Sequence, residues 1–246
     1  MTIRVGVHGA AGRMGLATVA AVEAAGDLEL VATTHRGDEL RAFADAGCDV
    51  VVDFSVAESA RVALPWLAMH GIHAVSGTTG LTDDDFTTVR QAFGDGPAHC
   101  LWAPNFAVSA VLAMRFAELA APFFDTAEVI EYHHNAKLDA PSGTALATAD
   151  RIAAARSDAF GPDPTAHEAL AGSRGGAGPA GVRVHAVRMA GMTAHQEVVL
   201  GTSGQTLTIR QDSYDRSSFM PGVLLAVRRI SDVPGTTIGL DALLGV

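Results

Sequence analysis

The sequence predicts an α/β fold, in which a Rossmann-type, doubly wound parallel sheet precedes an α+β domain with a mixed or antiparallel sheet. In the first half of the chain, uninterrupted apolar runs alternate with helical patterns, as expected for parallel strands buried on both faces. A glycine-rich turn joins the first of these strands to the first helix. In the second half, apolar and polar residues alternate, a pattern typical of strands with one solvated face.

The expected elements of the first domain follow one another as strand and helix. A helix runs from the glycine-rich turn to about Ala25, and two more are expected over 58–70 and 83–93. A segment beginning at Thr236 could return to this domain near the end of the chain. The expected strands cover 3–7, 28–34, 49–54, 72–76 and 99–102.

The second domain is expected to begin with a helix over 108–121. We assign 1–107 with 217–246 to dinucleotide binding and 108–216 to substrate binding and oligomerisation. The glycine-rich segment 171–181 is expected to be mobile, and 182–187, 196–201 and 206–212 to form antiparallel strands. The remaining elements are a strand over 127–132 and helices over 142–156 and 217–229.

Composition excludes several classes of partner. The 246 residues include 27 acidic and 17 basic side chains, and the net charge of −10 argues against nucleic acid or an anionic membrane as the main partner. The two stretches without charged side chains, 62–82 and 96–114, are interrupted by proline and glycine and do not resemble a membrane span. With two cysteines in no metal-type spacing and no signal peptide, we expect a cytoplasmic protein.

The turn Gly9-x-x-Gly12-x-x-Gly15 follows the first strand and opens a helix, which is the context of a dinucleotide-binding turn. The first glycine permits the tight turn, the second lets the backbone approach a pyrophosphate, and the third permits close packing of helix on strand. Ala11 stands where the usual fingerprint has glycine. The alternative is a glycine-rich turn that binds no ligand.

The end of the second strand favours NADPH over NADH. NAD-selective sites place an acidic side chain there to bind the ribose 2′-hydroxyl, whereas this chain has Thr34-His35-Arg36. Arg36, with Arg13 and His35, would instead face a 2′-phosphate. The alternative for Arg36 is a solvated loop residue.

Two further turns follow strands four and five. Ligands of open α/β sheets bind at the carboxyl edge of the strands, where both turns are expected. Thr and Asn side chains there could bind a carboxamide, and Phe106 offers an apolar face. The turns are Gly77-Thr78-Thr79 and Ala103-Pro104-Asn105-Phe106.

The stretch from His133 to Thr144 combines proton donors with a helix start. His133, His134 and Lys137 precede a Pro-Ser-Gly-Thr sequence typical of a helix N-terminus, where free amide groups bind anions. One segment could thus hold a carboxylate and deliver a proton beside it. A metal site at the paired histidines is disfavoured because no third ligand has a recognisable spacing. Lys137 could also be an ordinary surface charge.

Taken together, these motifs resemble the 4-hydroxy-tetrahydrodipicolinate reductase family, also called dihydrodipicolinate reductases, of bacterial lysine and diaminopimelate synthesis. The resemblance covers nearly the whole chain. The run His-His-x-x-Lys-x-Asp-Ala-Pro-Ser-Gly-Thr is its most specific part. The motifs are Gly9-Ala-Ala-Gly-Arg-Met-Gly15, Asp53-Phe-Ser55, Gly77-Thr-Thr-Gly80, Ala103-Pro-Asn-Phe106, Glu131-Tyr-His-His-Asn-Ala-Lys137, Asp139-Ala-Pro-Ser-Gly-Thr144, Ala194-His-Gln-Glu197 and Asp215-Arg-Ser-Ser-Phe219.

The resemblance implies an NAD(P)H-dependent reductase of a cyclic dicarboxylate, and His35 and Arg36 favour NADPH, with NADH possible. His133 would donate the proton and Lys137 would be a second acid, while His134, Ser142, Gly143 and Thr144 would hold the carboxylates. It also implies a homotetramer that meets through the sheets of the second domain. The implied cofactor residues are Gly9, Ala10, Ala11, Gly12, Arg13, Met14, Gly77, Thr78, Thr79, Ala103, Pro104, Asn105 and Phe106.

The chain departs from many relatives at two places. His35 and Arg36 replace an acidic residue after the second strand, and Ala136 replaces a histidine just before the lysine. Two other readings are another NAD(P)-dependent dehydrogenase acting on an amino-acid-derived substrate and a non-catalytic NADPH-binding sensor. The whole stretch from His133 to Thr144 favours the reductase.

Overall fold

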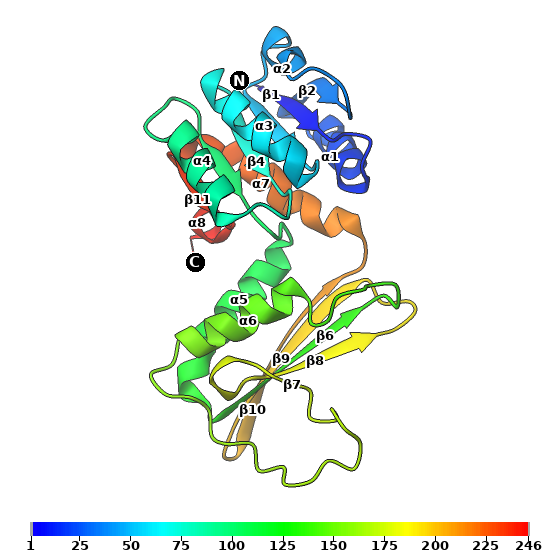
Figure 1. The fold of residues 1–246 in the computed structure, drawn as a ribbon, viewed down its shortest axis with the longest axis vertical. Helices are drawn as coiled ribbons and strands as arrows, with labels where there is room; N and C mark the ends of the chain where they lie inside the picture. Colours follow the sequence, from blue (N-terminus) through cyan, green and yellow to red (C-terminus); the bar gives the residue numbers. More distant parts are fainter. Residues whose placement is uncertain (1, 246) are drawn as a thin grey trace. The chain divides into compact units, whose positions relative to one another are not determined.

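In the computed structural model, which describes residues 2–245, the chain forms two compact units. The first consists of Met1–Val108 and Arg216–Val246, and the second of Ser109–Asp215. Among the described residues, no helix is long and apolar enough to cross a membrane. Because each unit has its own sheet (Figure 1), each is described separately.

The first unit is built on a six-stranded sheet in the order β11-β5-β4-β3-β1-β2. All five pairings are parallel, and the predicted Rossmann-type sheet is confirmed. From β1 the chain first adds β2 on one side and then β3 on the other, so the topological switch point lies between β1 and β3. The strands are β1 (Ile3–His8), β2 (Leu28–Thr34), β3 (Val50–Asp53), β4 (His73–Ser76), β5 (Cys100–Trp102) and β11 (Thr236–Ile238).

The central strands are buried because helices cover the sheet. Val5, Val7 and Val51 have no exposed surface, which accounts for the uninterrupted apolar runs. The segment from Thr236 does return to this sheet, where β11 extends it beside β5. The helices are α1 (Arg13–Ala24), α2 (Arg41–Asp45), α3 (Ala57–Met69), α4 (Asp83–Phe93), α7 (Met220–Arg229) and α8 (Asp241–Leu244).

The helix expected over 217–229 is in fact two elements. A 3-10 turn covers Arg216–Phe219, and the α-helix α7 begins at Met220. Pro221 explains the position of this start, because proline has no amide hydrogen and fits only the first turn of an α-helix. The short helix α2 was not predicted, because five residues carry too little periodicity to be recognised.

The second unit contains a five-stranded mixed sheet in the order β10-β9-β6-β8-β7. β9 pairs antiparallel with β6 and β10, as expected, but β8 runs parallel to β6. The antiparallel expectation for 182–187 holds only for the short pairing with β7 and was wrong for the pairing with β6, because the chain leaves β6, passes through helix α6 and returns in a βαβ crossover. The strands are β6 (Thr126–His133), β7 (Gly176–Ala177), β8 (Arg183–Arg188), β9 (Ala194–Thr202) and β10 (Gln205–Ser213).

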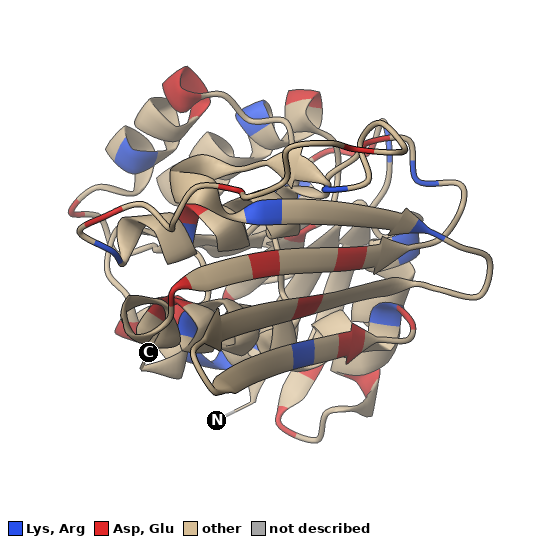
Figure 2. Cartoon of the chain, turned by 90° about the horizontal axis from the view of Figure 1, so that it is seen from below, with Lys and Arg blue, Asp and Glu red and all other residues tan. Residues whose placement is uncertain are grey.

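The two faces of this sheet differ. On one face, Val129, Val184 and Leu200 pack with residues of α5 (Val108–Ala120) and α6 (Gly143–Ala154) to form the core. On the other face, charged pairs such as Arg174 with Glu128 and Arg210 with Glu197 join neighbouring segments. Figure 2 shows acidic and basic residues side by side on the strands. The mobility of 171–181 stays a prediction.

Candidate active site

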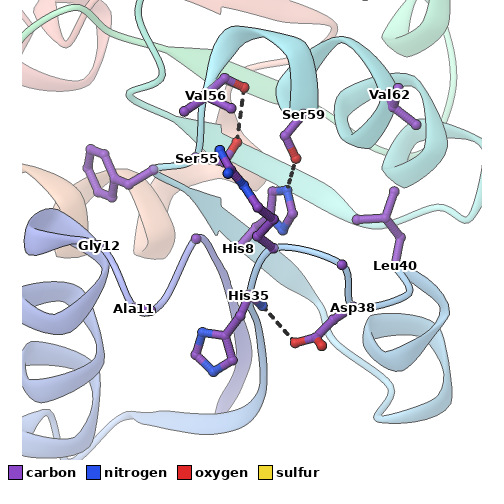
Figure 3. Close-up of a pocket in the computed structure, with 14 residues that line it drawn as sticks. His8, Ala11, Gly12, His35, Asp38, Leu40, Ser55, Val56, Ser59 and Val62 are labelled. Carbon is purple, nitrogen blue, oxygen red and sulfur yellow. Dashed lines mark hydrogen bonds between the residues drawn. The ribbon is translucent and has the colours of Figure 1, made fainter.

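A cavity of about 610 Å³ opens at the switch point of the first sheet, where the ends of β1 and β3 meet. Ligands of doubly wound sheets bind at this position. Figure 3 shows that the glycine turn, the segment after β2 and the start of α3 surround it. Its lining residues are His8, Gly9, Ala11, Gly12, His35, Arg36, Gly37, Asp38, Leu40, Phe54, Ser55, Val56, Ser59 and Val62.

Two glycines of the turn are required by close backbone contacts. Gly9 has φ of +79°, and a Cβ there would lie 2.7 Å from the carbonyl oxygen of Phe54. A Cβ on Gly15 would lie 2.2 Å from the carbonyl oxygen of Gly9. Both distances are far below a normal van der Waals contact, so larger residues would force the turn away from the strands.

The turn presents the N-terminus of α1 to this edge of the sheet. Gly12 is the N-cap and forms no side-chain capping bond, so the amide groups of the first turn are available to an anion. Two of the residues expected to hold the cofactor differ in exposure. Ala10, in the glycine turn, is buried, and Arg13, in the first turn of α1, is exposed. Ala10, Arg13 and Met14 lie in the turn or helix but do not line the cavity.

His35 and Arg36, which were predicted to face a 2′-phosphate, line the cavity together with Asp38, which was not predicted. Asp38 accepts a 2.8 Å hydrogen bond from the backbone amide of His35 and so shapes the segment after β2. The carboxylate follows the end of the strand by four residues, beyond the place where an acidic residue is usually sought. It forms part of the same wall as Arg36.

His8, at the end of β1, lines the cavity and forms hydrogen bonds on both sides of its ring. Its Nδ1 lies 2.7 Å from the hydroxyl of Thr34, and its Nε2 lies 2.7 Å from the hydroxyl of Ser59. Burial lowers the pKa of His8, although the charge of Asp53 opposes this shift. A neutral imidazole thus joins the end of β2 to helix α3.

The two further turns lie together beside the cavity rather than in its lining. A Cβ on Gly77 would lie 2.2 Å from a ring carbon of Phe54. The rings of Phe106 and Phe54 pack edge to face, with their centroids 5.7 Å apart. The side-chain oxygen of Thr78 is buried and has no hydrogen-bond partner within the described chain. Of the remaining predicted residues, Ala103 is buried, Asn105 is half-buried, and Thr79 and Pro104 are exposed.

In the second unit, β6 ends at His133, and a loop leads from there to the N-terminus of α6. Nδ1 of His133 lies 2.5 Å from Oε2 of Glu131, and the histidine side chain is 17% exposed while the glutamate is fully buried. Residues two apart on a strand point to the same face, which explains why the two side chains meet.

Besides His133, Glu131 contacts Arg188 and the backbone of Ser142. Both terminal nitrogens of Arg188 donate to its oxygens at 2.8 Å, and the backbone amide of Ser142 donates to Oε1 at 3.0 Å. Arg188 also donates to the carbonyl oxygen of Asp139 at 2.6 Å. One buried carboxylate therefore joins the end of β6, the start of α6 and the loop between them.

Opposing effects set the pKa values of Glu131 and His133. Burial alone would raise the pKa of Glu131, but the hydrogen bonds from Arg188, His133 and Ser142 outweigh it and lower the pKa. Burial lowers the pKa of His133, and the positive charges of Lys137 and Arg188 act in the same direction, against the effect of Glu131. The site therefore pairs a charged glutamate with a neutral imidazole near pH 7.

Lys137 lies in the loop and is paired. Its Nζ donates to both oxygens of Asp139 at 2.7 and 2.8 Å, and this contact lowers the pKa of Asp139. The lysine is only 20% exposed, so it is not an ordinary solvated surface charge. The neighbouring His134 is exposed.

The predicted helix start is present at Ser142. Its side-chain oxygen accepts a 3.2 Å hydrogen bond from the amide of Ala145, so Ser142 caps α6. A Cβ on Gly143 would meet no atom within 4 Å, so no contact within the second unit requires glycine at this position. Thr144 is half-buried in the same turn.

Nothing in the sequence indicates that Arg188 belongs to the site, whereas the position of Glu131 on its strand indicates that this residue has a buried partner. Glu131 shares a strand face with the apolar residues Ala127 and Val129, and a charged residue at such an inward position indicates a buried partner. Arg174, in the glycine-rich segment, pairs with Glu128 at 2.9 Å on the opposite face of the sheet. No cluster of three or more potential metal ligands occurs in residues 2–245.

The fold and the glycine turn define a class, the Rossmann-type oxidoreductases with a second, α+β unit. Within that class, the chain belongs to the dihydrodipicolinate reductase family. The family's N-terminal model, "Dihydrodipicolinate reductase, N-terminus", matches residues 3–106, and the C-terminal one, "Dihydrodipicolinate reductase, C-terminus", matches 109–244.

Full-length relatives support this assignment. The chain is 56% identical to the 4-hydroxy-tetrahydrodipicolinate reductase of Corynebacterium urealyticum and 57% identical to that of Nocardia farcinica, with 99% of each chain covered. The solved structure of a dipicolinate-bound dihydrodipicolinate reductase from Paenisporosarcina sp. TG-14 superposes with a TM-score of 0.89 at 35% identity. That superposition covers 98% of this chain and 99% of the other.

Proposed function

We propose that this protein reduces 4-hydroxy-tetrahydrodipicolinate to tetrahydrodipicolinate in lysine and diaminopimelate biosynthesis. The substrate loses water, one ring carbon accepts a hydride, and the charge that develops is neutralised by one proton. The observation that carries the proposal is the convergence of His133 and the start of helix α6 on one buried carboxylate, with Lys137 in the loop between them. The names of the full-length relatives agree with it.

The substrate's carboxylates are assigned to the start of α6. The first amides of this helix favour a negative charge, and the loop that leads to the helix carries the exposed His134. The absence of a side chain at Gly143 leaves room for a carboxylate to reach those amides. Dipicolinate, which the related solved structure contains, is itself a cyclic dicarboxylate. The proposed binding residues are His134, Ser142, Gly143 and Thr144.

His133 is assigned the proton and Lys137 the role of second acid or carboxylate clamp. Because Nδ1 of His133 contacts Glu131, Nε2 is the nitrogen that can face the substrate. Burial lowers the pKa of His133, and the two negative charges of a bound dicarboxylate would raise it and favour the protonated form.

NADPH would bind at the edge of the first sheet, and it supplies the hydride when bound. The cavity of about 610 Å³, the bare N-terminus of α1 and the unpartnered oxygen of Thr78 all fit a dinucleotide. Arg36 is the residue proposed to select the 2′-phosphate, with His35 beside it. The neighbouring carboxylate of Asp38 is available to a ribose hydroxyl, so NADH use at lower efficiency remains part of the proposal.

We further propose that the protein is a cytoplasmic homotetramer assembled through the second unit. The face of its sheet opposite α5 and α6 carries half-buried Ile130, Tyr132 and Val199 among paired charges. Such a face suits contact with another copy of the chain. Light scattering after size-exclusion chromatography would show four chains of 25.3 kDa.

The test of the proposed function is NADPH oxidation coupled to freshly synthesised 4-hydroxy-tetrahydrodipicolinate, with the full-length protein. We expect substrate-dependent loss of NADPH absorbance, inhibition by dipicolinate, and a higher kcat/KM for NADPH than for NADH. Absence of substrate-dependent oxidation would exclude the reductase. Equal or better use of NADH would remove the assigned role of Arg36.

A further inference from the structure

We propose that Glu131 is a positioning residue that holds the proton donor His133 and the carboxylate anchor at the start of α6 in one fixed arrangement. The inference rests on the proposed function for the roles of these two parts. Glu131 itself is fully buried, so it would act through its neighbours rather than by touching the substrate. Its four hydrogen-bond contacts reach the donor, the anchor and Arg188.

The first consequence concerns which nitrogen of His133 carries the proton. An ionised carboxylate can only accept hydrogen bonds, so Nδ1 of His133 must be the donor in its 2.5 Å contact with Glu131. In the neutral imidazole, Nε2 is then the unprotonated nitrogen, and in the charged form it gains the transferable proton. A carboxylate thus fixes both the ring orientation and the tautomer.

Glu131 also holds the carboxylate anchor at the start of α6. The oxygen of Glu131 that does not contact His133 accepts the amide hydrogen of Ser142, the N-cap of α6. Both ends of the loop 134–141 are therefore attached to a single carboxylate group, and Arg188 secures the middle through the carbonyl of Asp139. This arrangement sets the distance between the acid and the helix start without any side chain in the substrate space.

The third consequence concerns protonation. The charged groups around His133 are Glu131 on its own strand, Arg188 on β8 and Lys137 in the loop, and only Glu131 favours the imidazolium. Removal of its charge should therefore make His133 harder to protonate. Because the protonated form is the donor, the alkaline fall of kcat should move to lower pH.

The decisive variant is Glu131→Gln, which keeps the side-chain size but removes the charge and places an amide group near Nδ1 of His133. We expect kcat at pH 7.5 to fall by roughly 10- to 100-fold, which is no more than the lower end of the rate enhancement that a general acid supplies. We also expect the alkaline limb of the kcat profile to move to lower pH. Binding of NADPH, which belongs to the first unit, should be unchanged. Glu131→Asp restores the charge and should recover part of kcat and of the pH profile.

A matched control is Glu118→Gln on α5. Like Glu131, Glu118 is paired with arginine, with Arg115 at 2.5 Å and Arg151 at 3.8 Å, but it contacts neither His133 nor Ser142. The control should lose ion pairs without a change in the pH profile. If both variants lower kcat equally with unchanged profiles, Glu131 is only structural and the proposal is wrong.

Nitrogen-15 NMR of histidine-labelled wild-type protein decides the matter even if the Gln variant does not fold. We expect neutral His133 to carry its proton on Nδ1, and a proton on Nε2 would overturn the proposal. This readout does not depend on turnover. A wild-type protein without reductase activity would therefore refute the proposed function, whereas an active protein with the Nε2 tautomer would refute only the role of Glu131.

Discussion

β1 and β6 each lead through a loop to the N-terminus of a helix, but the two loops differ in what they place there. After β1 the N-cap is Gly12, which forms no capping bond, and the neighbouring Gly15 has no room for a Cβ. After β6 the N-cap is Ser142, whose side chain caps α6, and the neighbouring Gly143 has open space around it. The first loop is constrained by backbone packing, and the second by hydrogen bonds to a buried carboxylate.

This difference separates binding from chemistry. Bare amides at the start of α1 can hold a phosphate without any titratable group, so their action is independent of pH. The end of β6 and the loop after it add His133 and Lys137, and the protonation state of His133 would respond to the charge of the proposed dicarboxylate. Substitutions in the first loop should therefore change affinity for the nucleotide, and substitutions in the second should change the rate or the affinity for the dicarboxylate.

The largest expected effect is that of His133→Gln. Loss of a general acid typically costs about 10²–10⁴ in rate, so kcat should fall by that order. Steady-state NADPH oxidation measures it, with the exposed His167→Gln of the same unit as the control. Turnover like that of wild type would remove His133 from its assigned role.

Arg36→Met tests the one side chain near the first loop that we assign to specificity. A hydrogen bond to a charged group contributes about 1.5–3 kcal/mol, so kcat/KM for NADPH should fall roughly 10- to 100-fold. The value for NADH should stay the same because NADH has no 2′-phosphate. Parallel assays with the two nucleotides measure the ratio, and an equal loss with both would contradict selection by Arg36.

Gly15→Ala probes the backbone packing of the first loop. The added methyl group would meet the carbonyl of Gly9, and overpacking of this kind costs about 1–3 kcal/mol, enough to raise the Kd of NADPH roughly tenfold. Gly26→Ala is the matched control, because no atom lies within 4 Å of its Cβ position. Fluorescence titration with NADPH measures both variants. Equal affinities would show that the close contact is not needed for binding.

Gly143→Ala should have the smallest effect of these substitutions, and unlike Gly15→Ala it should stabilise the protein. Alanine in a helix is more favourable than glycine by about 0.5–1 kcal/mol, and no contact opposes the methyl group, so the melting temperature should rise slightly. The methyl group would occupy space assigned to a substrate carboxylate, so KM should increase. A higher melting temperature with unchanged KM would place the carboxylate elsewhere.

Much of the fold could be predicted because buried parallel strands and glycine turns leave strong local patterns. The all-parallel first sheet and the return of β11 follow from such patterns. The direction of β8 could not be read in the same way, because alternation of apolar and polar residues is the same in parallel and antiparallel strands. Only the crossover through α6 determines it.

The candidate site was predictable where its residues are close in sequence. His133, Lys137 and Ser142 lie within ten positions of one another, and the structure places them on one strand end, loop and helix start. Arg188 lies far along the chain, and its contact with Glu131 depends on the pairing of β8 with β6. Likewise, Ser59 reaches His8 only because α3 packs beside β1.

The most direct test of this separation of binding and chemistry is a calorimetric titration of NADPH into the His133→Gln variant. We expect this variant to bind NADPH with the Kd of the wild-type protein, together with the loss of kcat described above. A Kd raised about tenfold or more, equivalent to at least 1.4 kcal/mol of lost binding energy, would contradict it.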